Sequence, residues 1–308
     1  MASSSRSHPA TRLLAGKIKT VFQHVPRGIA GDEEEIHQLR VSARRLRVAL
    51  PMLAARPGGS RVRRARRALR RLVRAAGTGR DFDVILPLLE EGTESPSMPA
   101  ALRRRLVRAL KTAHARSRNH TAEALLDVEI AKLRRDLAKV LLRGGEADEV
   151  VEGRLRAEWE RRGRTALEGL RAIGERYDPQ ALHVSRRQLR HLRYLAECAG
   201  ELRGQPSRAA DLLKKLQARL GDLNDNHVLT RWLEAFAERS QLRGAGDLAA
   251  ASLRELAHFR DRGRGLHRAF LEQQPVETLG RALRALRGAE GSARDLTTAS
   301  SLSAPREA

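Results

Sequence analysis

The stretch HQLRVSARRLR at residues 37–47 returns 146 residues later as HVSRRQLRHLR at residues 183–193. Aligned in this way, the two stretches carry the same residue type at five positions: His37 and His183, Arg40 and Arg186, Arg44 and Arg190, Leu46 and Leu192, and Arg47 and Arg193. Matches between arginines are common in a chain this rich in arginine, but two coincident histidines are much rarer by chance. The pattern therefore indicates an internal repeat.

Further matches follow each of these stretches. Residues 69–84 align with residues 213–228, 144 positions further on, and the alignment pairs two glycines and two aspartates: Gly77 with Gly221, and Asp81 with Asp225. The same offset brings HARSR at 114–118 onto HFRDR at 258–262. A repeat of roughly 145 residues is too long for a solenoid unit. It fits two similar helical bundles in one chain.

The whole chain has the periodicity of amphipathic helices. Leucine, alanine and arginine recur at spacings of three and four residues, and no strand-like alternation interrupts them, so we predict an all-α fold. Clusters of glycine and proline predict the helix breaks, with a further break at Gly221. We expect a flexible N-terminus over residues 1–9, helical repeats over 10–142 and 154–287, a linker over 143–153, and a disordered tail over 288–308.

The repeated motif forms a basic stripe when it is placed on a helix. Its basic members fall within about 80° of one another, and leucines and alanines form a second stripe roughly 120° away. The first stripe comprises His37, Arg40, Arg44 and Arg47, and the second copy comprises His183, Arg186, Arg190 and Arg193. Asp32 followed by Glu35 predicts a helix start near Glu33. Pro51 predicts a kink or an early end.

The overall charge points to a partner of opposite sign. The 308 residues include 60 lysines and arginines against 37 aspartates and glutamates, a formal net charge of +23. Such an excess indicates a polyanion, and arginine suits phosphate because its planar side chain binds two oxygens at once. A GC-rich genome, in which arginine replaces lysine throughout, is the alternative explanation of the arginine bias. Nine aromatic residues are few for a protein that stacks single-stranded bases.

Other features narrow the compartment. The single cysteine, Cys198, excludes an internal disulfide framework and favours a reducing setting. No stretch approaches the roughly 20 apolar residues of a membrane span, and the N-terminus lacks the apolar region of a secretory signal. We therefore expect a cytoplasmic protein that does not enter the membrane.

A second basic helix follows each motif. Residues 61–74 contain eight arginines and no acid, and the later copy offers Lys214, Lys215 and Arg219. Such charge runs are usually solvated helix faces. Like charges one helical turn apart repel by a few tenths of a kcal/mol per pair, however, and the crowding occurs in both repeats. We infer that a bound anion compensates it.

The chain offers little support for catalysis. Arginine occupies the positions one turn away from each motif histidine, where a metal site would need a second ligand. Neither a G-x-S-x-G elbow nor a P-loop G-x-x-x-x-G-K-[ST] is present. Asp81 and Asp225 are expected to cap the following helix or to orient a motif arginine. We predict no cofactor, no metal and no enzymatic activity.

These paired motifs resemble the CHAD family, the conserved histidine α-helical domain. The resemblance rests on the two H-x2-R-x3-R-x2-R stretches, on the L-[RK]-[RK]-L runs that end in a glycine and on the aspartate after each, and it extends over roughly residues 10–275. It implies two four-helix bundles related by pseudo-two-fold symmetry, whose basic helices face each other across a central groove or tunnel. It also implies binding of inorganic polyphosphate, at polyphosphate granules in bacteria. The E-x-E-x-K motif of a fused triphosphate-hydrolysing domain is missing, so the chain resembles the stand-alone form.

The candidate polyphosphate-binding residues come from the basic stripes, from the helix that follows each stripe and from the third aligned segment. They are His37, Arg40, Arg44, Arg47, Arg67, Arg70, Arg71, Arg74, His114, Arg118, His183, Arg186, Arg190, Arg193, Lys214, Lys215, Arg219, His258 and Arg262. A histidine among arginines gains a proton more readily beside phosphate, so we hypothesise that binding strengthens as the pH falls toward about 6.

Two other functions stay open at this point. A net charge of +23 would bind any nucleic-acid backbone. A phosphohydrolase would need a metal site, for which the few candidate ligands are Asp81, Asp83, Asp222 and Asp225. Chain-length preference and oligomeric state do not follow from the sequence.

Overall fold

The computed structural model describes residues 8–77, 79–91 and 99–286, and all regular secondary structure in these ranges is helical. The all-α prediction is therefore confirmed. The helices are α1 (Pro9–Ile29), α2 (Glu33–Leu53), α3 (Ser60–Ala75), α4 (Arg80–Glu91), α5 (Ala100–Leu126), α6 (Ile130–Leu141), α7 (Asp148–Arg171), α8 (Pro179–Arg203), α9 (Arg208–Leu242) and α10 (Gly246–Glu272). A further helical segment covers residues 275–286.

The ends of the chain lie largely outside this description. Residues 1–7 of the expected flexible N-terminus and the whole expected tail over 288–308 are outside the described residues, while Pro9 is already the first residue of α1. The loop between the halves is shorter than the expected linker over 143–153. Because α7 begins at Asp148, the second part of that segment is helical.

The order of helices in the first half returns in the second. α5 and α10 have bounds that differ by 146 positions at both ends, and α2 and α8 cover the two copies of the motif. α3 and α4 together correspond to the single long helix α9, so the break predicted at Gly221 is wrong. A glycine inside a helix costs about 1 kcal/mol, and α9 offsets it by packing along both α8 and α10.

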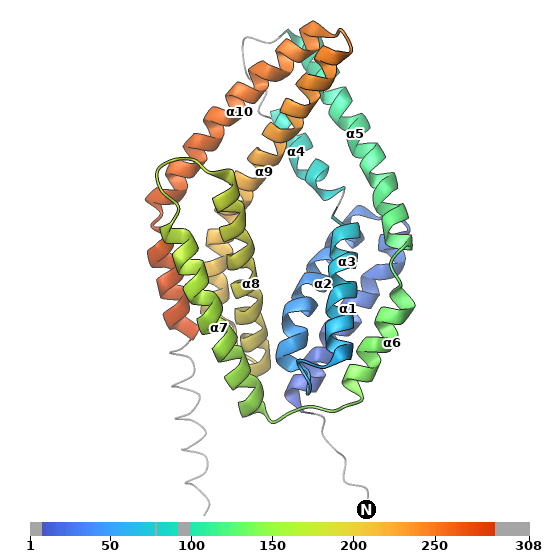
Figure 1. Cartoon of the computed structure of the whole chain (residues 1–308), viewed down its shortest axis with the longest axis vertical. Helices are drawn as coiled ribbons and strands as arrows, with labels where there is room; N and C mark the ends of the chain where they lie inside the picture. Colours follow the sequence, from blue (N-terminus) through green and yellow to red (C-terminus); the bar gives the residue numbers. More distant parts are fainter. Residues whose placement is uncertain (1–7, 78, 92–98, 287–308) are drawn as a thin grey trace, which may run out of the picture.

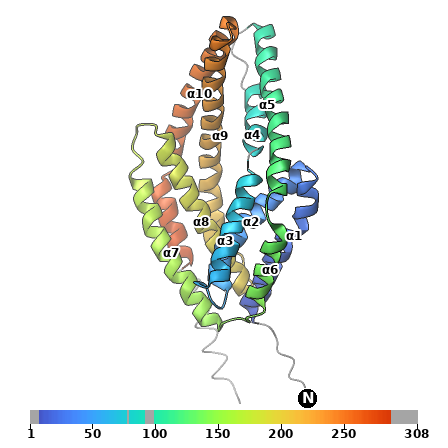
Figure 2. The same cartoon turned by 45° about the vertical axis from the view of Figure 1, so that its right-hand side comes forward.

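The helices form two groups that meet at both ends of an open frame (Figure 1). One group comprises α1, α2, α3 and α6, and the other comprises α7, α8 and the adjoining parts of α9 and α10. α2 contacts α8 at the lower end, and α4 and α5 contact α9 and α10 at the apex. Figure 2 shows the same long reach of α5, α9 and α10 to the apex after a turn of 45°.

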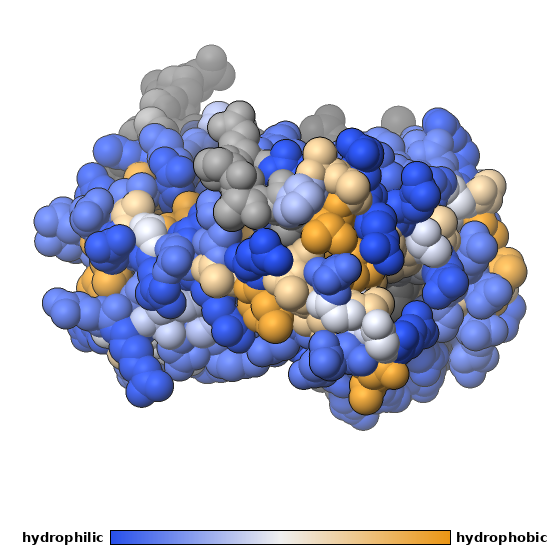
Figure 3. Space-filling model, turned by 90° about the horizontal axis from the view of Figure 1, so that it is seen from above, coloured by the Kyte–Doolittle hydropathy of each residue, from blue (hydrophilic) through white to orange (hydrophobic). Residues whose placement is uncertain are grey.

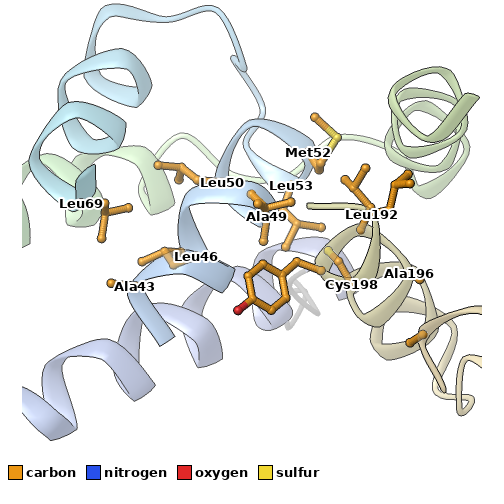
Figure 4. Packing of buried hydrophobic residues seen from close by; sticks show 14 of the residues in the cluster. Ala43, Leu46, Ala49, Leu50, Met52, Leu53, Leu69, Leu192, Ala196 and Cys198 are labelled. Carbon is orange, nitrogen blue, oxygen red and sulfur yellow. The ribbon is translucent and has the colours of Figure 1, made fainter. Parts of the chain in front are cut away.

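Two hydrophobic clusters hold these contacts. The larger one runs through both groups without a gap, and includes Leu53 and Leu192 where α2 meets α8 (Figure 4). The smaller one lies at the apex and comprises Ile85, Leu89, Leu106, Leu110, Leu229, Leu233, Leu256 and Phe259. The two expected bundles are thus not independent units, because each shares core with the other at two places. Since buried leucines contribute about 1.5–3 kcal/mol each, both junctions are fixed.

Both ends of α2 are defined by side chains. Asp32 accepts a hydrogen bond from the backbone N–H of Glu35 (3.0 Å), which confirms the predicted start. At the other end Pro51 lies in the last turn, and α2 continues to Leu53. Arg154 of α7 donates to the carbonyl oxygens of Met52 (2.7 Å) and Ala54 (3.0 Å), two of the groups that a helix end leaves without partners.

The surface at the apex end is mainly polar (Figure 3). Seen from the apex end, hydrophilic residues cover most of the molecule and hydrophobic ones gather in small patches (Figure 3). Within the described part of the chain, every helix is too short or too polar to cross a lipid bilayer.

Candidate anion-binding cavity

The two groups of helices enclose a central cavity of about 1400 Å³. Its walls come from α2 and α3 on one side and from α8 and α9 on the other, with α4 contributing near the apex. Ten arginines, one lysine and three histidines line it, against two aspartates. Surplus charge of one sign in a concave site concentrates ions of the opposite sign.

Most of the motif residues predicted from sequence meet in this cavity. The structure brings eleven of the nineteen candidates into its lining: His37, Arg40, Arg44, Arg47, Arg70, Arg74, His183, Arg186, Arg190, Arg193 and Lys214. They include both complete basic stripes. Aligned positions occur on both walls, such as Arg44 with Arg190 and Arg70 with Lys214, so the two walls are chemically similar.

The other eight candidates do not line the cavity. They are Arg67, Arg71, His114, Arg118, Lys215, Arg219, His258 and Arg262. Several are held by neighbours outside it: Arg71 pairs with Glu129 (3.5 Å), His114 with Asp83 (2.7 Å), Arg118 with Glu33 (2.7 Å) and Arg219 with Asp222 (4.0 Å). Arg262 and His258 both lie against the ring of Phe259. Arg67 lines a second pocket, described below.

The reason for this division is helical geometry. Adjacent residues on a helix point about 100° apart, so Arg70 and Lys214 face the cavity while Arg71 and Lys215 turn away from it. The third aligned segment lies on α5 and α10, which pack at the apex and not along the cavity. Residue type alone does not distinguish these positions.

Sequence reasoning missed other lining residues. Arg187, His227 and Arg231 are basic or titratable, and Gln180, Gln217 and Asn224 add amide groups. Arg187 follows Arg186 in the motif, so a wider stripe would have included it. His227 and Arg231 come after the predicted break at Gly221. Because α9 continues past this glycine without a break, His227 and Arg231 lie on the same helix as Lys214 and line the same cavity.

Arg44 and Arg190 occupy the most crowded part of the cavity. Each lies on the motif helix of one half, and each is largely withdrawn from water. Burial together with repulsion from Arg40 and Arg190 lowers the pKa of Arg44 to about 9. Burial and repulsion from Arg186 lower the pKa of Arg190 to about 10. Both stay charged at neutral pH, so the cavity holds closely spaced like charges that an anion would relieve.

Two polar groups on α9 border the cavity. The Nδ1 of His183 donates a hydrogen bond to the side-chain oxygen of Asn224 (3.0 Å), which fixes the orientation of the imidazole ring. Asp225 accepts from the amide of Asn224 (3.1 Å) inside α9, so it caps no helix, contrary to one of the two roles expected for it. Asp81 lies in the first turn of α4, where a carboxylate is favoured by the helix dipole.

A second basic pocket of about 650 Å³ adjoins the cavity. It shares Arg44, Arg47, Arg70, Arg187, Arg190 and Tyr194 with the cavity lining. His191 belongs to this pocket, and burial together with repulsion from Arg162 lowers its pKa to about 4.

Within the described residues, no cluster of three or more histidine, cysteine, aspartate or glutamate side chains is arranged to hold a metal ion.

The family model of the CHAD domain matches residues 12–234 of the chain. The chain belongs to the CHAD domain family. The match runs from α1 into α9, so it includes both copies of the His/Arg motif and all the basic helices that line the cavity.

Among solved structures, this CHAD chain is similar to the crystal structure of the CHAD domain from the plant Ricinus communis. The two share 21% sequence identity with a TM-score of 0.60, and the similarity covers 92% of this chain and 94% of that chain. At this identity the likeness establishes the fold. No curated protein matches the CHAD chain.

Proposed function

We propose that this CHAD protein binds linear inorganic polyphosphate in its central cavity and does not hydrolyse it. The observation that carries the proposal is the pair Arg44 and Arg190, two half-buried guanidinium groups that repel their neighbours across the facing helices α2 and α8. Phosphate oxygens are suitable counter-charges because guanidinium groups bind them in a bidentate manner.

The shape and lining of the cavity favour a flexible phosphate chain over nucleic acid. Its basic residues lie inside a concave space, whereas proteins that read duplex DNA present a protruding helix or arm. Tyr194 is the single aromatic side chain of the lining, and it is 5% exposed beneath the guanidinium groups of Arg45 and Arg193. Such a wall offers charge without a platform for stacking bases.

The acids of the lining argue for binding without turnover. Asp81 and Asp225 are its two carboxylates, and Asp225 already accepts a hydrogen bond from Asn224. A phosphohydrolase of the metal-dependent type would place several such ligands around the reacting phosphate. Magnesium-dependent release of orthophosphate that is lost in D81A or D225A would contradict a purely binding role.

Because polyphosphate collects in granules, the proposal extends to location. We expect the protein in the cytoplasm, at polyphosphate granules, held there by the cavity. A fluorescent fusion should colocalise with stained granules, and the R44E/R190E form of the same fusion should be diffuse.

The binding experiment is a competition at fixed salt. Polyphosphate, orthophosphate, RNA and duplex DNA are titrated calorimetrically into the wild-type chain and into R44E/R190E. We expect polyphosphate to bind most tightly, and the double variant to weaken its binding about 100-fold or more, since each charged hydrogen bond contributes about 1.5–3 kcal/mol.

A matched control separates the cavity from the overall charge. R164E/R268E changes the net charge by the same amount at two exposed arginines that line neither the cavity nor the second pocket. This control should retain nearly full affinity. Equal losses in the two double variants, or tighter binding of duplex DNA than of polyphosphate, would contradict the proposal and favour a non-specific nucleic-acid binder.

A further inference from the structure

Two pockets that share lining residues with the cavity differ in charge. The second basic pocket, termed the basic mouth, is lined by nine arginines, and none of its lining residues within the described chain is acidic. On the other half, a pocket of about 490 Å³, termed the neutral mouth, shares Arg193 and Lys214 with the cavity. Its lining has three cations, Arg45, Arg193 and Lys214, against three acids, Glu197, Glu201 and Asp211.

These two mouths occupy equivalent places in the repeat. At the offset of 144 that pairs Arg70 with Lys214, three arginines of the basic mouth fall on uncharged or acidic residues of the neutral mouth: Arg63 on Ser207, Arg66 on Ala210 and Arg67 on Asp211. At the offset of 146 that pairs the motifs, Glu197 and Glu201 fall on Pro51 and Ala55. These five differences make the basic mouth more positive, and they outnumber the one aligned difference of opposite sign, Arg45 against His191.

Ion pairs reinforce the difference. Arg193 pairs with Glu197 (3.4 Å), and Arg45 donates to the same carboxylate (2.9 Å). Arg47 is the equivalent of Arg193 in the first half. Burial, together with repulsion from Arg66, Arg70 and Arg187, lowers the pKa of Arg47. At the basic mouth, Arg162 is partly neutralised by Glu158, which accepts a hydrogen bond from it (2.8 Å) and lies outside the lining.

We propose that a long polyphosphate chain leaves the central cavity through the basic mouth alone, past Arg63, Arg66 and Arg67, while the carboxylates of the neutral mouth exclude it. The chain is then held at one end in the cavity and extends over α3 on one side of the molecule. This inference rests on the proposed function, and it predicts that affinity depends on chain length through residues that a short phosphate never reaches.

The test compares tripolyphosphate with long-chain polyphosphate by calorimetry. R63E/R66E/R67E should weaken the binding of the long chain at least about ten-fold, and should leave the binding of tripolyphosphate unchanged. R104E/R164E/R268E carries the same change in net charge at exposed positions on α5, α7 and α10, and should affect neither ligand. Circular dichroism confirms that each variant is folded before titration.

The opposite change of charge tests the neutral mouth. E201R/D211R replaces two exposed acids of the neutral mouth by cations, and should raise the affinity for the long chain without altering that for tripolyphosphate. The inference is overturned if R63E/R66E/R67E weakens both ligands equally or neither of them, or if E201R/D211R leaves the long chain unaffected. Failure of the proposed function is distinct, because R44E/R190E would then leave both ligands bound as tightly as before.

Discussion

At the scale of single residues, the cavity depends on which face of a helix each arginine occupies. Arg70 and Arg71 are neighbours in sequence, yet Arg70 lines the cavity and Arg71 pairs with Glu129 outside it. A sequence with so many arginines identifies the basic helices well and their inward faces less well. The two basic stripes of the repeated motif are the exception, since all eight of their residues line the cavity.

His227 gives the cavity a dependence on pH. Burial and repulsion from Arg231 and His183 lower the pKa of His227 below its ordinary value. A bound phosphate chain would oppose this repulsion and raise the pKa, so the complex takes up a proton and affinity rises as the pH falls between the two pKa values. Calorimetry from about pH 8 to about pH 6, corrected for the titration of phosphate itself, should show proton uptake that is smaller in H227Q.

Proton uptake by His227 would add a third histidine to the hypothesis that polyphosphate binding strengthens as the pH falls. H37Q/H183Q serves as the comparison, because these two side chains line the same cavity on the opposing motif helices. Affinity that stays flat over the whole range in the wild type would contradict proton uptake by the cavity histidines on binding.

At the scale of helices, the end of α2 depends on α7. Arg154 donates to the carbonyl oxygens of Pro51 (3.5 Å), Met52 (2.7 Å) and Ala54 (3.0 Å), and it forms an ion pair with Glu146. R154A would remove donors from buried acceptors, which typically costs about 1–3 kcal/mol. Urea denaturation should show this loss of unfolding free energy, with R154K intermediate.

Arg154 lies away from the cavity lining, so the folded R154A variant should bind polyphosphate as tightly as the wild type. A stability equal to that of the wild type would mean that water or other groups satisfy the end of α2 as well as the guanidinium does. The same comparison tests whether the carbonyl groups that this end of α2 leaves without helical partners need a donor from a residue about 100 positions further on.

At the scale of the whole molecule, arginines on the two walls of the cavity repel each other. The two groups of helices are held together by the hydrophobic core between α2 and α8 and by the cluster at the apex. Repulsion between the arginines of the cavity opposes this packing. A ligand that binds only the folded state stabilises it by about 2.7 kcal/mol at a concentration of 100 times Kd. Polyphosphate should therefore raise the Tm by several degrees.

Differential scanning fluorimetry with increasing polyphosphate measures this shift. R44E/R190E should show a smaller shift, and its Tm without ligand should not fall, because the substitution also removes repulsion between half-buried like charges. An equal shift in the wild type and in this variant would place the stabilising ligand outside the cavity.

The sequence by itself determined the helical class, the repeat and the basic stripes, because helical periodicity and a matched pair of motifs are local properties that survive without contacts. Only the tertiary structure decided that Gly221 lies within a helix, that α4, α5, α9 and α10 close the frame at an apex, and that His227 and Arg231 join the cavity. It also decided which candidates are occupied by acidic partners elsewhere. These features depend mainly on packing between different helices, where the free energy of burying apolar surface outweighs local propensity.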